Sequence, residues 1–135
     1  VDMTIFFRTL GEHAAAALTP ETFADAFYAA AKRDAHRDEL AAWLARYAGR
    51  VAEDAFDAAQ RRETMRLANP KYILRNWLTQ EAIDRAHAGD ASGIDELLEV
   101  MRRPYEDQPG RARFAGKRPD WARNKAGCSM LSCSS

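Results

Sequence analysis

The residues of this sequence best suited to chemistry are two cysteines close to its end, Cys128 and Cys133. They stand in the run Cys-Ser-Met-Leu-Ser-Cys-Ser-Ser, which contains no histidine. A zinc site needs about four ligands on a fixed scaffold, so this pair does not predict a metal centre. Because small, polar terminal segments are usually exposed, we expect either two solvent-exposed thiols or a redox tail in which Cys133 pairs with another thiol.

The remaining titratable residues do not predict a catalytic constellation. The three histidines, His13, His36 and His87, are separated by whole predicted helices, and we expect them on helix surfaces. The acidic pairs Glu53-Asp54 and Asp95-Glu96 occupy adjacent helical positions, so the two side chains of each pair point about 100° apart. No catalytic residue is therefore assigned within the sequence.

Nucleotide and nucleic-acid sites are equally unsupported. The seven glycines form neither a phosphate-binding loop nor a dinucleotide fingerprint, so no cofactor-binding residue is predicted. Twenty basic and twenty acidic residues leave no net charge, which excludes the electrostatic footprint of a nucleic-acid partner. We expect the basic clusters to form surface salt bridges with interleaved acids: Arg61-Arg62, Arg102-Arg103, and Arg111 with Arg113.

The apolar pattern and the cysteine usage predict a soluble, cytoplasmic protein with no membrane partner. No stretch approaches the roughly 20 apolar residues of a spanning helix, and no secretory signal is visible. Two cysteines at one end cannot build a disulfide framework. The chain opens with Val1 and enters the apolar run at residues 3–7 without a helix start signal, from which we expect a piece of a longer polypeptide.

Helical periodicity extends nearly to residue 103, without a competing strand pattern. The first predicted helix carries an apolar face of Met3, Phe6, Phe7, Leu10, Ala14 and Ala17. The second begins at Thr19-Pro20 and carries Phe23, Ala26, Phe27 and Ala30. The third carries Leu40, Trp43, Leu44, Tyr47, Ala48 and Val51, with Trp43 as a core anchor. Residues 54–67 predict an exposed helix or a continuation of the third beyond a bend.

Two more helices follow. Asn69-Pro70 predicts the start of the fourth, and Gly89 predicts its left-handed stop. Its buried face consists of Leu74, Trp77, Leu78 and Ala82. Ser92 with Asp95 predicts a capping box for the fifth, whose stripe is Ile94, Leu97, Leu98 and Met101 and which Pro104 ends.

Prolines and glycines interrupt the chain after residue 103 and leave no room for regular structure between 104 and 120. We expect Trp121 to hold this tail to the helical body. The predicted fold is all-α, with about five helices in an irregular bundle over residues 1–103. An irregular tail over residues 104–135 follows and ends in Cys133-Ser134-Ser135.

Several sequence blocks resemble the C-terminal region of the selenoprotein O family. The longest is Asn69-Pro70-Lys71-Tyr72-Ile73-Leu74-Arg75-Asn76-Trp77-Leu78, which is followed by Gln80, Ala82, Ile83 and Gly89-Asp90. Other family landmarks occur in family order at residues 5–8, 43–47, 97–100, 103–109, 119–121 and 132–135. Together these blocks cover nearly the whole chain.

The resemblance implies a protein adenylyltransferase with a protein-kinase-like fold. In such proteins ATP binds in a flipped orientation with Mg²⁺, and AMP passes to Ser, Thr or Tyr hydroxyls of protein substrates. The ATP and Mg²⁺ sites lie upstream of the region seen here, so this segment would be inactive alone and would pack against the kinase-like body of the same polypeptide. Some members carry selenocysteine three residues from the C-terminus, and Cys133 holds that position.

The resemblance therefore implies a redox switch at Cys133 in a cytoplasmic bacterial protein. Cys128 is not part of the family pattern, which leaves open whether Cys133 pairs with Cys128 or with an upstream cysteine. Two other interpretations remain. The segment could be a stand-alone helical interaction or regulatory module without enzymatic activity, or a thiol–disulfide module built on the two cysteines.

Overall fold

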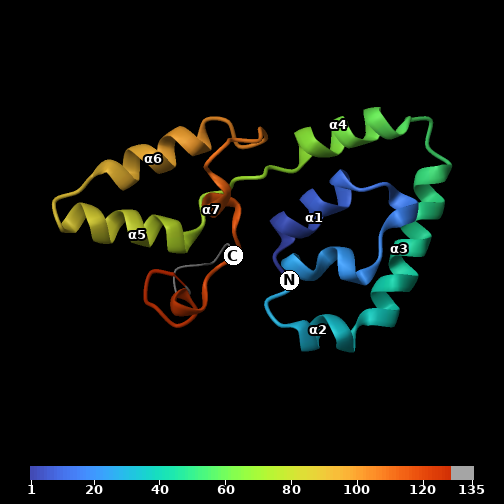
Figure 1. Ribbon diagram of the computed structural model, residues 1–135, viewed down its shortest axis with the longest axis horizontal. Helices are drawn as coiled ribbons and strands as arrows, with labels where there is room; N and C mark the ends of the chain where they lie inside the picture. Colours follow the sequence, from blue (N-terminus) through green and yellow to red (C-terminus); the bar gives the residue numbers. More distant parts are fainter. Residues whose placement is uncertain (129–135) are drawn as a thin grey trace. The chain divides into compact units, whose positions relative to one another are not determined.

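Helices form the regular structure of residues 1–128, the part of the chain that the computed structural model describes (Figure 1). No strand occurs among these residues, which confirms the all-α class. The chain divides into two units, Val1–Lys71 and Tyr72–Ser135, and each has its own apolar core. Residues 104–128 lie in the second unit, and the predicted boundary between residues 103 and 104 stays a prediction.

The first unit contains α1 (Met3–Glu12), α2 (Ala30–Ala35), α3 (Arg37–Ala52) and α4 (Ala58–Ala68), with 3₁₀ helices η1 (Ala15–Ala17) and η2 (Pro20–Ala26). In Figure 1, α3 and α4 curve around α1, and η2 lies along its other side. The core of this unit consists of Leu10, Leu18, Phe23, Ala26 and Leu44. Phe6 extends this core by stacking on Phe23, with ring centroids 4.4 Å apart.

A buried carboxylate begins α1. Asp2 has extended backbone and accepts a hydrogen bond from the Ile5 amide at 3.1 Å. This is an N-cap, since it satisfies one of the amides that a helix leaves open at its start. The prediction that no start signal precedes the apolar run is therefore wrong.

The first two predicted helices are shorter than expected. The first ends at Glu12 instead of Ala17, because the Arg61 side chain binds the carbonyls of Leu10 and His13 that a longer helix would use. The second begins at Pro20 as predicted but is a 3₁₀ helix that ends at Ala26, before extended backbone at Phe27.

The third predicted helix is confirmed as α3, with Leu44 buried in the core. Trp43 is only half-buried; it lies at the edge of the core and stacks on Tyr47 with ring centroids 5.5 Å apart. Residues 58–68 form the separate helix α4, which has no fully buried residue. Asp57 caps it by accepting from the amides of Ala59 and Gln60, so the exposed-helix alternative is right.

The second unit contains α5 (Asn76–His87), α6 (Ser92–Met101), the short α7 (Ala112–Ala115) and the 3₁₀ helix η3 (Asp120–Ala122). Helices α5 and α6 lie side by side, joined by a short connection (Figure 1). The core consists of Tyr72, Trp77, Leu78, Ala82, Leu97, Val100, Phe114, Ala122 and Cys128.

The fourth helix does not begin at Asn69-Pro70. Asn69 instead ends α4, where its Nδ2 donates to the Met65 carbonyl at 2.8 Å. The Tyr72 amide donates to the Pro104 carbonyl at 3.1 Å, so this stretch bonds to a distant segment and α5 starts only at Asn76. As a result Leu74, predicted on the buried face, is exposed.

The end of α5 and the start of α6 are close to the predictions. Gly89 has φ +90° just after α5 and confirms the left-handed stop. Helix α6 starts at Ser92 as predicted, but the predicted capping box with Asp95 is absent. The Ser92 amide donates instead to Asp90 Oδ1 at 3.0 Å.

Residues 104–120 are more ordered than predicted. Gln108 donates to the carbonyls of Val100 and Arg103, both at 2.9 Å, and so closes the end of α6. Phe114, on α7, is buried in the core. Trp121 is 47% exposed and meets Trp77 edge-on, so Phe114 holds this segment to the core more firmly than Trp121 does. Within residues 1–128, no helix has the length and apolar character needed to cross a membrane.

Candidate functional site

The two predicted redox cysteines differ in what the structure describes of them. Cys128 is 6% exposed and belongs to the core of the second unit, so the expectation that it is solvent-exposed is wrong. It forms no disulfide with the other described residues. Cys133 lies outside the described residues. A redox role of either cysteine stays a prediction.

A turn that is bonded to α5 places Cys128 in the core of the second unit. The Cys128 amide donates to the Lys125 carbonyl at 3.1 Å, and Gly127 has φ +82°, a conformation that side-chain-bearing residues rarely adopt. The Lys125 ammonium pairs with Asp84 of α5, whose other oxygen accepts from Gln80 at 2.8 Å. This pairing raises the pKa of Lys125 and lowers the pKa of Asp84.

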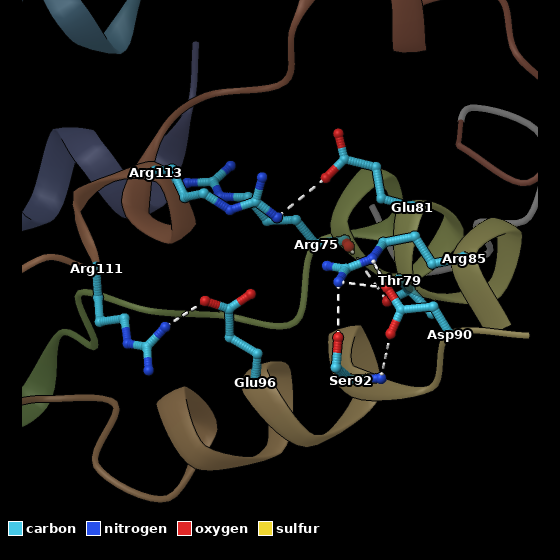
Figure 2. Close-up of polar contacts among 9 residues, drawn as sticks. All are labelled: Arg75, Thr79, Glu81, Arg85, Asp90, Ser92, Glu96, Arg111 and Arg113. Carbon is cyan, nitrogen blue, oxygen red and sulfur yellow. Dashed lines mark hydrogen bonds and ion pairs between the residues drawn. The ribbon is translucent and has the colours of Figure 1, made fainter.

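The α5–α6 connection holds the most strongly perturbed carboxylate of the second unit (Figure 2). Arg85 donates to Asp90 Oδ2 at 3.0 and 2.7 Å, and to the Ser92 hydroxyl at 2.7 Å. Hydrogen bonds from Ser92 and Arg85 lower the pKa of Asp90 from 3.8 to about 2. A carboxylate with such a pKa stays ionised at neutral pH and does not act as a proton donor. Its role is to fix the geometry between two helices.

Two further ion pairs tie α7 to the helix pair (Figure 2). Arg111 pairs with Glu96 of α6, and Arg113 lies 3.2 Å from Glu81 of α5. The Arg113 guanidinium also lies over the Phe114 ring, 4.7 Å from its centroid. These contacts confirm the predicted salt bridges of Arg111 and Arg113. Glu81, Asp90 and Glu96 each contact an arginine. These pairs fix the positions of α5, α6 and α7, and none of the three carboxylates is left as a free acid–base group.

Arg61 was expected to form surface salt bridges, but its guanidinium bonds to other groups. Its guanidinium donates to the carbonyls of Leu10 at 2.8 Å and His13 at 3.1 Å, and to the Tyr47 hydroxyl at 2.6 Å. It therefore joins α4 to the end of α1 and to α3. No local spacing could reveal this, because the acceptor carbonyls lie about fifty positions earlier in the chain.

Candidate metal ligands do not converge in the described part of the chain. Among residues 1–128, no three His, Cys, Asp or Glu side chains are grouped closely enough to hold a metal ion. The three histidines were expected on helix surfaces; all three are exposed, but they lie at helix ends. His13 follows α1, His36 stands between α2 and α3, and His87 ends α5.

Comparison with known proteins decides the family. No protein-family model matches the chain. Proteins named protein nucleotidyltransferase YdiU match all 135 residues, with 57% identity in Xanthomonas oryzae pv. oryzae, 56% in Xanthomonas euvesicatoria pv. vesicatoria and 54% in Azoarcus sp.. The chain is thus similar to the YdiU family, which is the selenoprotein O family. It matches the C-terminal part of that family and spans about a quarter of the length of these relatives.

The match to YdiU proteins confirms the resemblance to the C-terminal region of the selenoprotein O family. Glu81 of α5 and Glu96 of α6 pair with arginines at α7, and Cys128 is enclosed in the core. In the second unit, these ion pairs thus position the helices relative to one another.

Proposed function

We propose that this chain is the C-terminal helical segment of a protein adenylyltransferase. The observation that carries the proposal is 57% identity over all 135 residues to relatives named protein nucleotidyltransferase. A match that covers the whole chain disfavours a stand-alone interaction module, because unrelated modules would not share this sequence from end to end.

In the proposed reaction, a Ser, Thr or Tyr hydroxyl of a protein substrate attacks the α-phosphate of ATP. A phosphodiester to AMP forms, pyrophosphate leaves, and the hydroxyl proton is released. Mg²⁺ would neutralise phosphate charge in such a transfer. The described residues of this segment do not fit a Mg²⁺ site, because no carboxylate cluster exists among them. We therefore assign ATP and Mg²⁺ binding to the rest of the longer polypeptide.

The proposed role of the segment is to cover the kinase-like catalytic body of a cytoplasmic bacterial enzyme. Large apolar side chains on the surface of each unit support this role. They include Val1, Met3 and Phe56 in the first unit and Leu74, Ile94 and Leu98 in the second. Surfaces of this kind are typical of regions that another surface covers.

We further propose that Cys133 is a redox-responsive thiol. The run Ser132-Cys133-Ser134-Ser135 supports this proposal, because it resembles the motif in which some family members carry selenocysteine. Oxidation would join Cys133 to a second thiol, with two electrons and two protons passing to a peroxide that is reduced to water and alcohol or to two waters. Since Cys128 is buried, pairing with Cys128 requires the core of the second unit to open, whereas an upstream cysteine has no such requirement.

Label transfer from ATP tests the activity. The longer polypeptide, with Mg²⁺, should attach label from α-³²P ATP to protein and release pyrophosphate, and it should attach no label from γ-³²P ATP. Protein labelling from the γ-phosphate alone would show a kinase and overturn the proposal.

Oxidant treatment of matched variants tests the thiol. Peroxide should change the transfer rate of the wild-type polypeptide and leave the rate of Cys133→Ser unchanged. The variant Cys128→Ser is the matched control and identifies the partner. If Cys133→Ser responds to peroxide like the wild type, Cys133 is not the switch.

A further inference from the structure

An apolar groove opens on the first unit beside its first residue. The groove has a volume of about 390 Å³, and its apolar lining includes Val1, Met3, Phe6 and Leu40. Phe6 and Leu40 connect it to the core of the unit, since both pack against the buried cluster. Val1 and Met3 are 57% and 58% exposed, so two large apolar side chains on its wall lack the burial that their type favours.

The backbone at the groove is held firmly. The Asp2 amide donates to the Ala26 carbonyl at 2.7 Å, and the Tyr28 hydroxyl donates to the Asp2 carboxylate at 3.3 Å. Asp2 itself is 5% exposed, and its other oxygen caps α1. Any polypeptide that continues backwards from Val1 must therefore leave from the wall of this groove.

The groove is suited to apolar side chains and not to a charged ligand. Its two ionisable lining residues, His36 and Glu39, lie 3.1 Å apart and face each other. No other charged side chain lines it. An occupant that buries apolar surface gains from the hydrophobic effect here, whereas a phosphate or carboxylate would lose hydration without finding a cationic partner.

We propose that the polypeptide immediately preceding Val1 in the full-length YdiU-family protein covers this groove with apolar side chains. This inference rests on the proposed function only in taking the chain as the C-terminal part of a longer polypeptide. The relatives support that step, because the chain spans about a quarter of their length and matches their C-terminal part. A covalently joined segment is also present at high effective concentration, which favours it over a second copy of the chain.

Site-specific photocrosslinking in the full-length polypeptide tests the proposal. Benzoylphenylalanine replaces Leu40 in the groove or, as a matched control, Phe56, which is 60% exposed and does not line the groove. Irradiation of the Leu40 variant should give an intramolecular link to a peptide just before Val1, and irradiation of the Phe56 variant should not. Links from Leu40 to a second copy or to residues 72–128, or no link at all, would overturn the proposal.

Hydrogen exchange provides a second readout that does not depend on the probe. In full-length Met3→Asp, amides just before Val1 should exchange at least about tenfold faster, while amides of α5 and α6 stay unchanged. Unchanged exchange before Val1 would contradict the proposal. Failure of nucleotide transfer with the crosslink intact would overturn the proposed function and leave the groove assignment standing.

Discussion

At the scale of single residues, the Arg61 side chain joins three helices of the first unit, α1, α3 and α4. It donates to two carbonyls at the end of α1 and to the Tyr47 hydroxyl. Helix-end carbonyls that lose their partner pay a desolvation cost, so we expect Arg61→Met to lower the free energy of unfolding by about 1–3 kcal/mol. Urea denaturation followed by circular dichroism measures the change.

The neighbouring Arg62 provides the control for this substitution. Arg62 is exposed, and Arg62→Met should change the free energy of unfolding by less than about 0.5 kcal/mol. Equal losses in the two variants would show that the contacts of Arg61 do not stabilise the unit.

Asp90 predicts how the second unit responds to acid. Its pKa is about 2 in the folded chain, against an ordinary value of 3.8, because Ser92 and Arg85 donate to it. A carboxylate with a lowered pKa stabilises the fold above about pH 4, and this contribution disappears as the pH falls through about 2. Asp90→Asn should therefore lower the midpoint of urea unfolding at pH 7. The difference in midpoint between this variant and the wild type should shrink as the pH falls from 4 to 2. A difference that is constant with pH would contradict this.

The contacts of single residues were predictable where the partners are near in sequence, and they were not predictable where the partners are distant. Gly89 was predicted as a helix stop from local spacing, and the arginine pairs of α7 from composition. The contacts of Arg61 and the burial of Cys128 were not predicted, because their environments come from segments that tertiary packing brings together. Local signals also mislead when two elements compete for one residue, as Asn69 ends α4 instead of starting α5.

At the scale of helices, two glycines predict opposite responses to alanine. A Cβ at Gly11 would lie 2.7 Å from the Met65 Cβ, so the close approach of α1 and α4 depends on this glycine. Gly49 lies inside α3 with nothing within 4 Å of an added Cβ. We expect Gly11→Ala to destabilise the chain by about 1–3 kcal/mol through overpacking, and Gly49→Ala to stabilise it by about 0.5–1 kcal/mol.

Thermal unfolding of the two glycine variants measures both changes. The midpoint should fall for Gly11→Ala and rise for Gly49→Ala. A rise in both would mean that α4 shifts away from α1 at little cost. Periodicity predicted α3 well, because its stripe is long, but it could not show that Gly11 serves a helix contact.

Element boundaries were the least predictable part of the fold. A 3₁₀ helix replaced the second predicted α-helix, and α7 formed where proline and glycine suggested irregular backbone. In both places a buried phenylalanine, Phe23 or Phe114, lies within the short helix. Core packing therefore selected these local conformations over the intrinsic preferences of the backbone.

At the scale of the whole chain, charge balance predicts the pH range of weakest colloidal stability. Twenty acidic and twenty basic residues give an isoelectric point of about 7.0. With exposed apolar side chains and little net charge, this chain should self-associate most near pH 7 and less at pH 5 or 9, where like charges repel. Sedimentation velocity at the three pH values measures this, and association that increases steadily with pH would contradict it.

The enclosure of Cys128 makes its thiol a natural reporter of breathing motions in the second unit. An alkylating reagent reaches a thiol that is 6% exposed only when neighbouring side chains separate, so its modification rate reflects the opening equilibrium. In Cys133→Ser, where one thiol remains, we expect slow modification in dilute buffer and a steep acceleration in urea, followed by mass spectrometry. Rapid modification in buffer would contradict this. The rate at which any oxidant reacts with Cys128 is then set by how often the helices around it separate.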